Sequence, residues 1–385
     1  MSKLAIIGAG YLQLPLVHKA KSLGIETHCF AWEEGAVCCQ VADYFYPISI
    51  TEKEQILSIC QQVRIDGIIT IASDLAVTTV NYVAQQMGLV GNQDAYTLLM
   101  TNKFFMREQF TSLGISSPKY KICRELFCDD VADLKFPLIT KPTDRSGSVG
   151  VTKVNSAMEL TNALKEAINN SFSQTAIVEE FIEGREVSVE CISWKGHHYL
   201  LAITDKTTTS APHFVEIAHT QPAKLSVELT KKIEQLVMKV LDALHIENGA
   251  SHTEIKITDN EELFVIEVGA RMGGDFIGSH LVHLSTGYDF LQATIELSLG
   301  TFTPPNLDKE EKYIAEVYFL SQETSWLKPI IENRENYPEI VEAKILNKNL
   351  TTLRSSSDRS GYLICKGQFQ HLKKELEQKK CTFVH

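Results

Sequence analysis

The first 95 residues alternate between short apolar segments and amphipathic segments, and few folds are compatible with this rhythm. The segments expected to form strands are 4–7, 26–31 and 67–71, and those expected to form helices are 12–23, 56–63 and 77–87. Gly8 and Gly10 mark the turn between the first strand and the first helix. Strands that alternate with helices form a parallel sheet covered by helices. We therefore predict that the chain begins with a Rossmann-like α/β domain.

Length and charge limit what such a chain can do. Its 385 residues are enough for two or three domains with a sizeable core. The formal net charge of −11 argues against nucleic-acid or acidic-membrane partners, because both require a basic surface. No run of about 18 apolar residues is present, and the N-terminus lacks the features of a secretory leader. We expect a cytoplasmic protein, and its acidity does not exclude small anionic ligands.

Two glutamates are expected to face each other across a hairpin. Residues 253–258 and 263–267 both alternate in the manner of strands, and residues 260–261 could form a two-residue turn between them. Such a turn places Glu254 opposite Glu267. The residues expected to point the other way, into a core, are Ile255, Ile257, Phe264 and Ile266. Facing like charges are unfavourable unless a cation neutralises them, and Mg2+ prefers one or two carboxylates together with phosphate oxygens. The alternative is an ordinary solvent-facing pair.

The segment after the second glutamate supports a ligand-binding role for the hairpin. Residues 268–275 read Val-Gly-Ala-Arg-Met-Gly-Gly-Asp. Arg271 could hold a phosphate or a carboxylate with its planar guanidinium, and a surface ion pair is the alternative. Gly273 and Gly274 would allow a ligand to approach the backbone closely.

Two earlier segments contain groups that could bind a nucleotide. Lys141 ends an apolar strand and precedes a glycine- and serine-rich loop at 143–150, whose backbone N–H groups could contact phosphate oxygens. This loop lacks the G-x-x-x-x-G-K-S/T pattern of a Walker loop. Further along, Glu179 and Glu186 could accept hydrogen bonds from an adenine and a ribose, with the backbone of 180–182 along the base. Taken singly, each segment could also be an ordinary loop or surface strand.

The order of these segments resembles the ATP-grasp superfamily of carboxylate–amine ligases, from Met1 to about residue 300. The fold class implied is α/β and α+β, an ATP-grasp fold with an N-terminal Rossmann-like domain. The implied divisions are a pre-ATP-grasp domain at 1–95, an ATP-grasp domain at 96–300 with a mobile lid at 119–190, and a C-terminal α/β portion at 301–385 that completes the ligase domain.

The resemblance also implies an activity and its cofactors. ATP and Mg2+, with Mn2+ as an alternative metal, would bind between two α/β units. The γ-phosphate would move to a carboxylate, and an amine would then displace phosphate from the acyl phosphate. Positioning and charge neutralisation would supply most of the catalysis. The implied partners are small-molecule carboxylate and amine substrates, and a homodimer is a further implication.

Individual residue roles are implied by the same resemblance. Arg271 would be catalytic, and Glu254 and Glu267 would be the metal ligands. The implied nucleotide-binding residues are Lys103, Lys141, Ser146, Gly147, Ser148, Glu179, Glu180, Phe181, Ile182 and Glu186. The candidate substrate residues are His213, Gly273, Gly274 and His280, in segments similar to those of amino-acid and dipeptide ligases. The two histidines could instead be packing residues. Many members carry Asn two residues after the second metal glutamate, whereas this chain has Gly269, which predicts a looser metal shell.

Three other interpretations fit part of the sequence. Gly8 and Gly10 form half of a dinucleotide fingerprint, but Gln13 replaces the third glycine, so an NAD-dependent oxidoreductase is a remote alternative. Within the ligases, phosphoribosylglycinamide synthetase and the carbamoyl-phosphate synthase large subunit share the motifs, although the chain carries only one set. A non-enzymatic ATP-binding regulator is the third, and the retained lysines, glutamates and Arg271 argue against it. The sequence does not identify either substrate.

Overall fold

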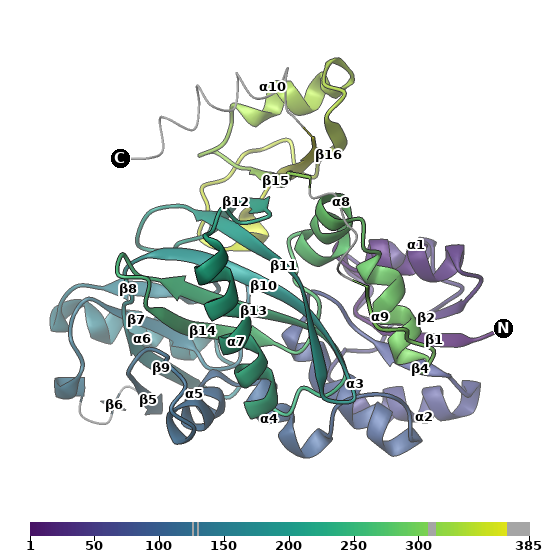
Figure 1. The fold of residues 1–385 in the computed structure, drawn as a ribbon, viewed down its shortest axis with the longest axis horizontal. Coiled ribbons are helices and arrows are strands. Elements are labelled where there is room, and N and C mark those ends of the chain that lie inside the picture. Colours follow the sequence, from purple (N-terminus) through teal and green to yellow (C-terminus); the bar gives the residue numbers. More distant parts are fainter. Residues whose placement is uncertain (125–126, 129–130, 307–312, 368–385) are drawn as a thin grey trace.

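The computed structural model describes residues 1–124, 127–128, 131–306 and 313–367. Figure 1 shows a large central sheet with three parts around it. The N-terminal α/β unit lies to the right, a smaller sheet with its helices lies at the lower left, and the C-terminal strands lie at the top.

The N-terminal unit is the predicted parallel α/β domain. Its sheet has the strand order β3-β2-β1-β4, and every pairing in it is parallel. The strands are β1 Lys3–Ile7, β2 Glu26–Phe30, β3 Tyr44–Tyr46 and β4 Gly67–Ile69, and the helices are α1 Leu14–Ser22, α2 Lys53–Val63 and α3 Asp74–Met87. Strand β1 is buried on both faces, with Leu4 and Ile6 in one apolar cluster and Ala5 and Ile7 in another. This burial explains its continuous apolar sequence.

A second sheet of five strands has the order β6-β5-β9-β7-β8 and is antiparallel. Its strands are β5 Tyr120–Arg124, β6 Phe127–Cys128, β7 Leu138–Pro142, β8 Thr152–Val154 and β9 Thr175–Glu180. Helices α4 Thr97–Thr101 and α5 Lys103–Ser112 precede the sheet, and α6 Ala157–Asn170 packs on it through Leu160 and Leu164. Because β7 and β9 are neighbours, the candidate residues Lys141 and Glu179 come from adjacent strands.

The central sheet has eight strands in the order β14-β13-β10-β11-β12-β15-β17-β16. The strands are β10 Arg185–Trp194, β11 His197–Thr208, β12 Glu216–Gln221, β13 Gly249–Ile257, β14 Leu263–Gly269, β15 Ala315–Leu320, β16 Ile340–Ile345 and β17 Gly361–Lys366. The associated helices are α7 Val227–Ala243, α8 Val282–Thr286, α9 Phe290–Ser298 and α10 Leu327–Glu332. Helix α7 buries Ile233 and Val237, four residues apart, as expected for an amphipathic helix. The C-terminal strands β15 to β17 extend this sheet.

The β13–β14 hairpin confirms the predicted pairing of Glu254 with Glu267 but reaches it by another route. The predicted two-residue turn is wrong: the N–H of Thr258 donates to the carbonyl of Glu262, so the loop is longer. After Glu254 the register shifts, and Ile255 pairs with Val265. One extra residue of β14 is therefore accommodated in a bulge, which brings Glu267 back opposite Glu254.

The bulge also changes which side chains of β14 enter the core. Ile255 is buried there as predicted, but on β14 the buried side chains are Val265 and Val268 rather than Phe264 and Ile266. Ile266 instead lines a cavity between the central sheet and the five-stranded sheet. An extra residue shifts the alternation of a strand by one position and so exchanges its two faces.

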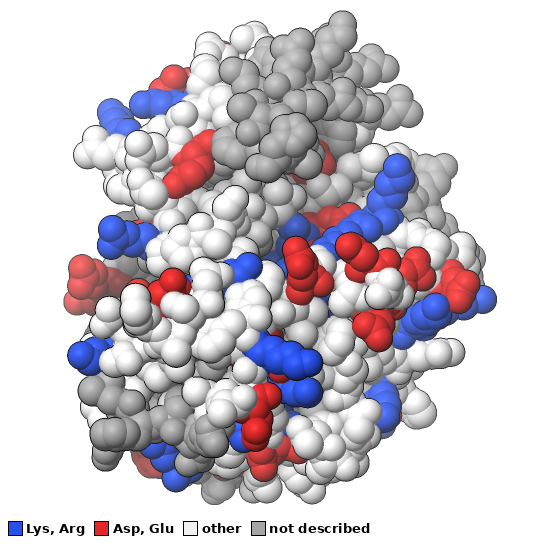
Figure 2. Space-filling view, turned by 90° about the vertical axis from the view of Figure 1, so that its left-hand side faces the viewer, with Lys and Arg blue, Asp and Glu red and all other residues white. Residues whose placement is uncertain are grey.

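Charged side chains of both signs share the surface. On the face drawn in Figure 2, lysines and arginines are interspersed with aspartates and glutamates rather than gathered into one large patch. Within the part of the chain that the structure describes, no helix has the length and apolar character needed to cross a membrane.

Candidate active site

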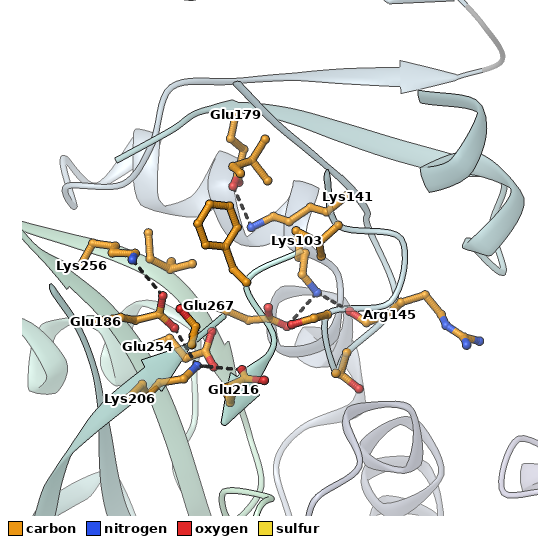
Figure 3. Close-up of a pocket in the computed structure, with 18 of the residues that line it drawn as sticks. Lys103, Lys141, Arg145, Glu179, Glu186, Lys206, Glu216, Glu254, Lys256 and Glu267 are labelled. Carbon is orange, nitrogen blue, oxygen red and sulfur yellow. Dashed lines mark hydrogen bonds and ion pairs between the residues drawn. The ribbon is translucent and has the colours of Figure 1, made fainter. Parts of the chain in front are cut away.

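A cavity lies between the five-stranded sheet and the central sheet, closed on one side by the 145–151 loop. The predicted residues that line it are Lys103, Lys141, Ser146, Gly147, Ser148, Glu179, Glu180, Phe181, Ile182, Glu186, His213, Glu254, Glu267 and Arg271. Figure 3 shows the labelled lysines and glutamates of both sheets and of α5 gathered around the cavity, including Lys103, Lys141, Glu179, Glu186, Glu254 and Glu267. Segments more than one hundred residues apart in the sequence therefore meet here.

Three other predicted residues lie elsewhere. Gly274 lines a smaller cavity that adjoins the first. Gly273 is buried and lines neither of these two cavities, and its N–H donates to Oε2 of Glu190 at 2.9 Å. His280 lines neither cavity, and its Nε2 lies 3.5 Å from a carboxylate oxygen of Glu342.

Lys141 belongs to a buried cluster of three charges. Its Nζ lies 2.7 Å from Glu179, and Nε of Arg107 lies 2.8 Å from the other oxygen of the same carboxylate. Burial alone would raise the pKa of Glu179, but the two adjacent cations hold it below its usual value. Burial lowers the pKa of Lys141, although Glu179 opposes this shift. Two cations and one anion leave a net positive charge beside the cavity, which suits an anionic ligand.

Lys103 links the hairpin to the glycine- and serine-rich loop. Its Nζ lies 2.7 Å from Oε1 of Glu267 and donates to the carbonyl of Arg145 at 2.6 Å. Lys103 is the first residue of α5, whose N-terminus is capped by the side chain of Asn102, which accepts from the N–H of Phe104 at 3.0 Å. The cap therefore orients the helical turn that carries this lysine.

Lys206 on β11 occupies the centre of the opposite wall and was not singled out by the sequence. Its Nζ lies 2.7 Å from Glu186, 3.3 Å from Glu216 and 2.5 Å from Glu254 (Figure 3). Burial by itself would lower the pKa of Lys206, but these carboxylates raise it well above its usual value. Lys206 therefore stays charged and compensates three glutamates, one of which is a predicted metal ligand.

The two opposed glutamates fit a hard divalent cation. Glu254 and Glu267 come from adjacent strands, line the same cavity and are each compensated by a lysine from another element. Among the described residues, no group of three or more His, Cys, Asp or Glu is arranged to hold a metal ion. A cation at this pair would take its remaining ligands from phosphate oxygens and water, which is the coordination that Mg2+ prefers.

The opposite end of the cavity is aromatic. Phe181 follows β9, and its ring centroid lies 5.6 Å from that of Phe214 in the β11–β12 loop, with the rings 24° from parallel. Nζ of Lys153 lies 3.8 Å from the centroid of the Phe181 ring. His213, beside Phe214, lines the same end. Stacked aromatic rings suit the flat face of a planar heterocycle.

The adjoining cavity is lined by polar side chains that the sequence did not reveal. Asp275 lies 2.6 Å from Nη1 of Arg359 and 3.2 Å from Nε2 of His219. Burial would raise the pKa of Asp275, but Arg359 and His219 hold it far below its usual value. Arg359 comes from the C-terminal portion and also lies 3.2 Å from Glu216. Such a polar wall suits a small ligand with its own charged groups.

The N-terminal glycine turn does not resemble a dinucleotide site. The side chain of Gln13 accepts from the N–H of Gly10 at 3.0 Å and donates to the carbonyl of Ile71 at 2.7 Å. Gln13 is buried in the turn. The backbone amide that would face a pyrophosphate is therefore already bonded within the protein.

Comparison with known proteins agrees with this geometry. Residues 134–279 match the family model of the ATP-grasp domain. The alanine–anticapsin ligase of Bacillus subtilis strain 168 is 30% identical over 302 residues, which cover 70% of this chain and 62% of that protein. The chain therefore spans less than two thirds of this relative.

Two solved structures show the same fold. The L-amino acid ligase from Bacillus licheniformis superposes with a TM-score of 0.80 at 22% identity, covering 99% of this chain and 97% of that one. The biotin carboxylase domain of the Hydrogenobacter thermophilus 2-oxoglutarate carboxylase, solved with MgADP, ADP and bicarbonate, has a TM-score of 0.75 at 16% identity and covers 99% and 90%. These likenesses confirm the predicted ATP-grasp fold.

Proposed function

Because this chain is an ATP-grasp domain protein, we propose that it is a Mg2+-dependent, ADP-forming ligase that joins the carboxylate of one amino acid to the amine of another. The observation that carries the proposal is the opposed pair of Glu254 and Glu267 in a cavity whose other charged groups include Lys103 and Lys141. Two facing carboxylates beside several cations are expected where a metal and phosphates bind together.

In the proposed arrangement the nucleotide extends along the cavity. The adenine occupies the aromatic end near Phe181, with the backbone of 180–182 along its edge, and Glu186 faces the ribose. The phosphates lie near Lys141 and Lys103, beneath the loop that contains Ser146, Gly147 and Ser148. This order is supported by the aromatic contact of Phe181 with Phe214 and by the contact of Lys103 with Glu267. A Mg2+ ion held by Glu254 and Glu267 would neutralise phosphate charge.

The proposed reaction has two steps. In the first, a carboxylate oxygen of one substrate attacks the γ-phosphorus of ATP, the bond from that phosphorus to the bridging oxygen breaks, and ADP leaves with the electron pair. In the second, the amine nitrogen attacks the carbonyl carbon of the acyl phosphate, the carbon–oxygen bond to phosphate breaks, and the nitrogen loses a proton. Lys103, Lys141 and Arg271 would stabilise the negative charge on the phosphoryl group during transfer.

Amino acids are proposed as substrates for two reasons. The adjoining cavity presents both acidic and basic side chains, Asp275, Glu216, Arg271 and His219, and a zwitterion can pair with groups of both signs. The names of the alanine–anticapsin ligase and the L-amino acid ligase point to the same class.

The domain boundaries stay predictions: an N-terminal domain at 1–95, an ATP-grasp domain at 96–300 with a mobile lid at 119–190, and a C-terminal portion at 301–385. The homodimer also stays a prediction. Residues 307–312 and 368–385 of the last segment lie outside the described residues.

The decisive experiment is phosphate release from MgATP across a panel of amino acids, supplied singly and in pairs. Glu267→Gln is expected to abolish the release, because it removes the charge of one proposed metal ligand. Glu262→Gln, in the exposed turn of the same hairpin, is the matched control and should retain it. Release that depends on an amino-acid pair and is lost only in Glu267→Gln supports the ligase.

Two other results would redirect the proposal. If MgATP binds but no amino-acid pair causes phosphate release, the substrates are not amino acids. Bicarbonate and purine precursors would then be tested as the carboxylate and amine substrates. If MgATP does not bind, the assignment of the cavity to a nucleotide is wrong.

A further inference from the structure

We propose that Asp74, from the N-terminal unit, positions Arg271 and occupies the space that a side chain at residue 269 would otherwise fill. The proposal rests on the function proposed above, because it assigns Asp74 a role through Arg271. Nη2 of Arg271 lies 2.8 Å from Oδ2 of Asp74, and the two side chains are only 12% and 14% exposed. Asp74 is therefore a positioning residue for a group that lines the proposed reaction centre.

Glycine at 269 makes this contact possible. A Cβ atom added to Gly269 would lie 2.5 Å from Oδ1 of Asp74 and 2.9 Å from the guanidinium carbon of Arg271. Both distances are too short for non-bonded atoms, so a side chain at 269 and the Asp74–Arg271 pair exclude each other. Glycine in place of the more usual Asn therefore leaves room beside Arg271 for Asp74, which comes from the N-terminal unit.

The backbone places Asp74 at this point by direct contact between the two segments. Ile71, at the end of β4, forms a parallel bridge with Met272, and the N–H of Ala72 donates to the carbonyl of Met272 at 3.1 Å. Ser73 then caps α3, of which Asp74 is the first residue. The N-terminal unit is thus joined to the 269–274 segment by main-chain hydrogen bonds.

The charges around Arg271 show why an orienting partner is needed. Burial by itself would lower the pKa of Arg271, whereas Asp74, Glu190 and Glu267 raise it above its usual value. Without Asp74, the carboxylates that attract the guanidinium would be those of Glu190 and of Glu267, a proposed metal ligand. Asp74 therefore keeps Arg271 available to substrate and Glu267 available to the metal.

A double-mutant cycle tests this mechanism. Asp74→Ala and Gly269→Ala should each lower kcat about 10-fold or more, the order of loss seen when a group that orients a metal-site residue is removed. The KM for ATP should change little, because the aromatic end is distant from the pair. Since Gly269→Ala acts by displacing the contact that Asp74→Ala removes, the double variant should lose much less kcat than the product of the two single losses. Multiplicative losses would overturn the proposal.

Two further variants control for folding and charge. Asp74→Asn keeps the shape of the side chain and one hydrogen-bond acceptor, and it should recover part of the activity lost in Asp74→Ala. Asp43→Ala removes an acidic partner of Lys21 elsewhere in the N-terminal unit and should leave kcat unchanged. An Asp74→Asn variant as impaired as Asp74→Ala would contradict the proposal that residue 74 positions Arg271 through its hydrogen bond.

The urea concentration at the unfolding midpoint is measured for the two single variants and the double variant, because this measurement requires no substrate. One outcome is that the two substitutions change the unfolding midpoint non-additively while no amino acid is turned over. This outcome would support the contact between residues 74 and 271 and contradict the proposed function. The other outcome is that amino acids are turned over but the substitutions at 74 and 269 act independently on kcat and on the unfolding midpoint. This outcome would support the proposed ligase and contradict the role of Asp74.

Discussion

At the scale of single residues, the site contains two buried clusters in which one charged group contacts several groups of opposite charge. Lys206 compensates Glu186, Glu216 and Glu254, and Lys141 shares Glu179 with Arg107. Such clusters seldom add much stability, because desolvation offsets the Coulomb attraction, but removing one partner leaves an uncompensated buried charge. The clusters are therefore better understood as devices that hold acceptors in place for a ligand.

Lys206→Met should destabilise the protein by about 3–5 kcal/mol, the range for a buried ion pair that loses one partner. Part of this loss should be recovered with Mg2+ and ADP, because a bound cation would replace the missing positive charge near Glu254. Urea denaturation with and without MgADP measures both effects. Lys256→Met is the matched control, since Lys256 contacts only one of these glutamates, Glu186, at 3.2 Å. Equal losses in the two variants would contradict the central role of Lys206.

Asp43 should make the stability of the N-terminal unit depend on pH. Hydrogen bonds from Lys21 and Thr27 lower the pKa of Asp43 to about 2, although burial opposes the shift. A depressed folded-state pKa stabilises the protein above the unfolded pKa of about 3.9, and this contribution is lost as the pH falls toward 2. Asp43→Asn should therefore lower the unfolding midpoint at pH 6 and have little effect near pH 2. An equal effect at both values would show that charge is not involved.

At the scale of secondary-structure elements, two local irregularities place the site. The bulge in β14 aligns Glu267 with Glu254, and the short connection at 181–184 carries the chain from the five-stranded sheet to the central sheet. Gly184 in that connection has φ +144°, and a Cβ atom there would lie 2.2 Å from the carbonyl oxygen of Ile257. Neither irregularity could be replaced by a regular strand without moving a cavity residue.

Gly184→Ala should destabilise the protein by more than the roughly 1–3 kcal/mol expected for backbone strain alone. It should also weaken MgATP binding, because Ile182 and Glu186 flank the glycine. Gly196→Ala is the control: Gly196 also has a positive φ, +78°, but a Cβ atom there meets nothing within 4 Å. Urea unfolding and calorimetric titration with ATP compare the two. If Gly196→Ala is equally harmful, the clash with β13 is not the cause.

At the scale of the whole molecule, the cavity is assembled by parts distant in the sequence. The C-terminal portion contributes Ser356, which lines the adjoining cavity, and Arg359, which holds Asp275 in the wall of that cavity. The N–H and the hydroxyl of Ser356 both donate to the carbonyl of Gly147 in the 145–151 loop at 3.3 Å. The N-terminal unit contributes Asp74 through the contact of Ile71 with Met272. The 145–151 loop is thereby bonded to the C-terminal portion of the chain.

Ser356→Ala should speed the release of ADP several-fold, because one of the two hydrogen bonds that hold the loop is lost. Stopped-flow displacement of a fluorescent ADP analogue measures the dissociation rate. Ser357→Ala, at an exposed neighbouring hydroxyl, should leave the rate unchanged. An unchanged rate in Ser356→Ala would show that this contact does not restrain the loop.

The amino-acid sequence by itself determined the elements whose signals are local. The parallel N-terminal sheet follows from the alternation of apolar and amphipathic segments, and the two strands of the β13–β14 hairpin follow from the alternation in 253–258 and 263–267. The pairing of Glu254 with Glu267 was predicted, but it depends on a bulge that the sequence did not indicate. Most of the residues implied by the resemblance to ATP-grasp ligases also line one cavity, because the order of their segments along the chain sets which strands carry them.

Only the tertiary structure decided how the charges in that cavity are paired. Lys206 lies ten or more residues from each of its carboxylates, Arg359 is 84 residues from Asp275, and Asp74 is 197 residues from Arg271. No periodicity or spacing links residues so far apart. The contacts of Lys206 depend on which strands of the central sheet are neighbours, and that of Asp74 with Arg271 depends on how the N-terminal unit packs against the rest of the molecule. The bulge in β14 is similar: the apolar pattern of 263–268 fits either face of a strand, and packing selects one.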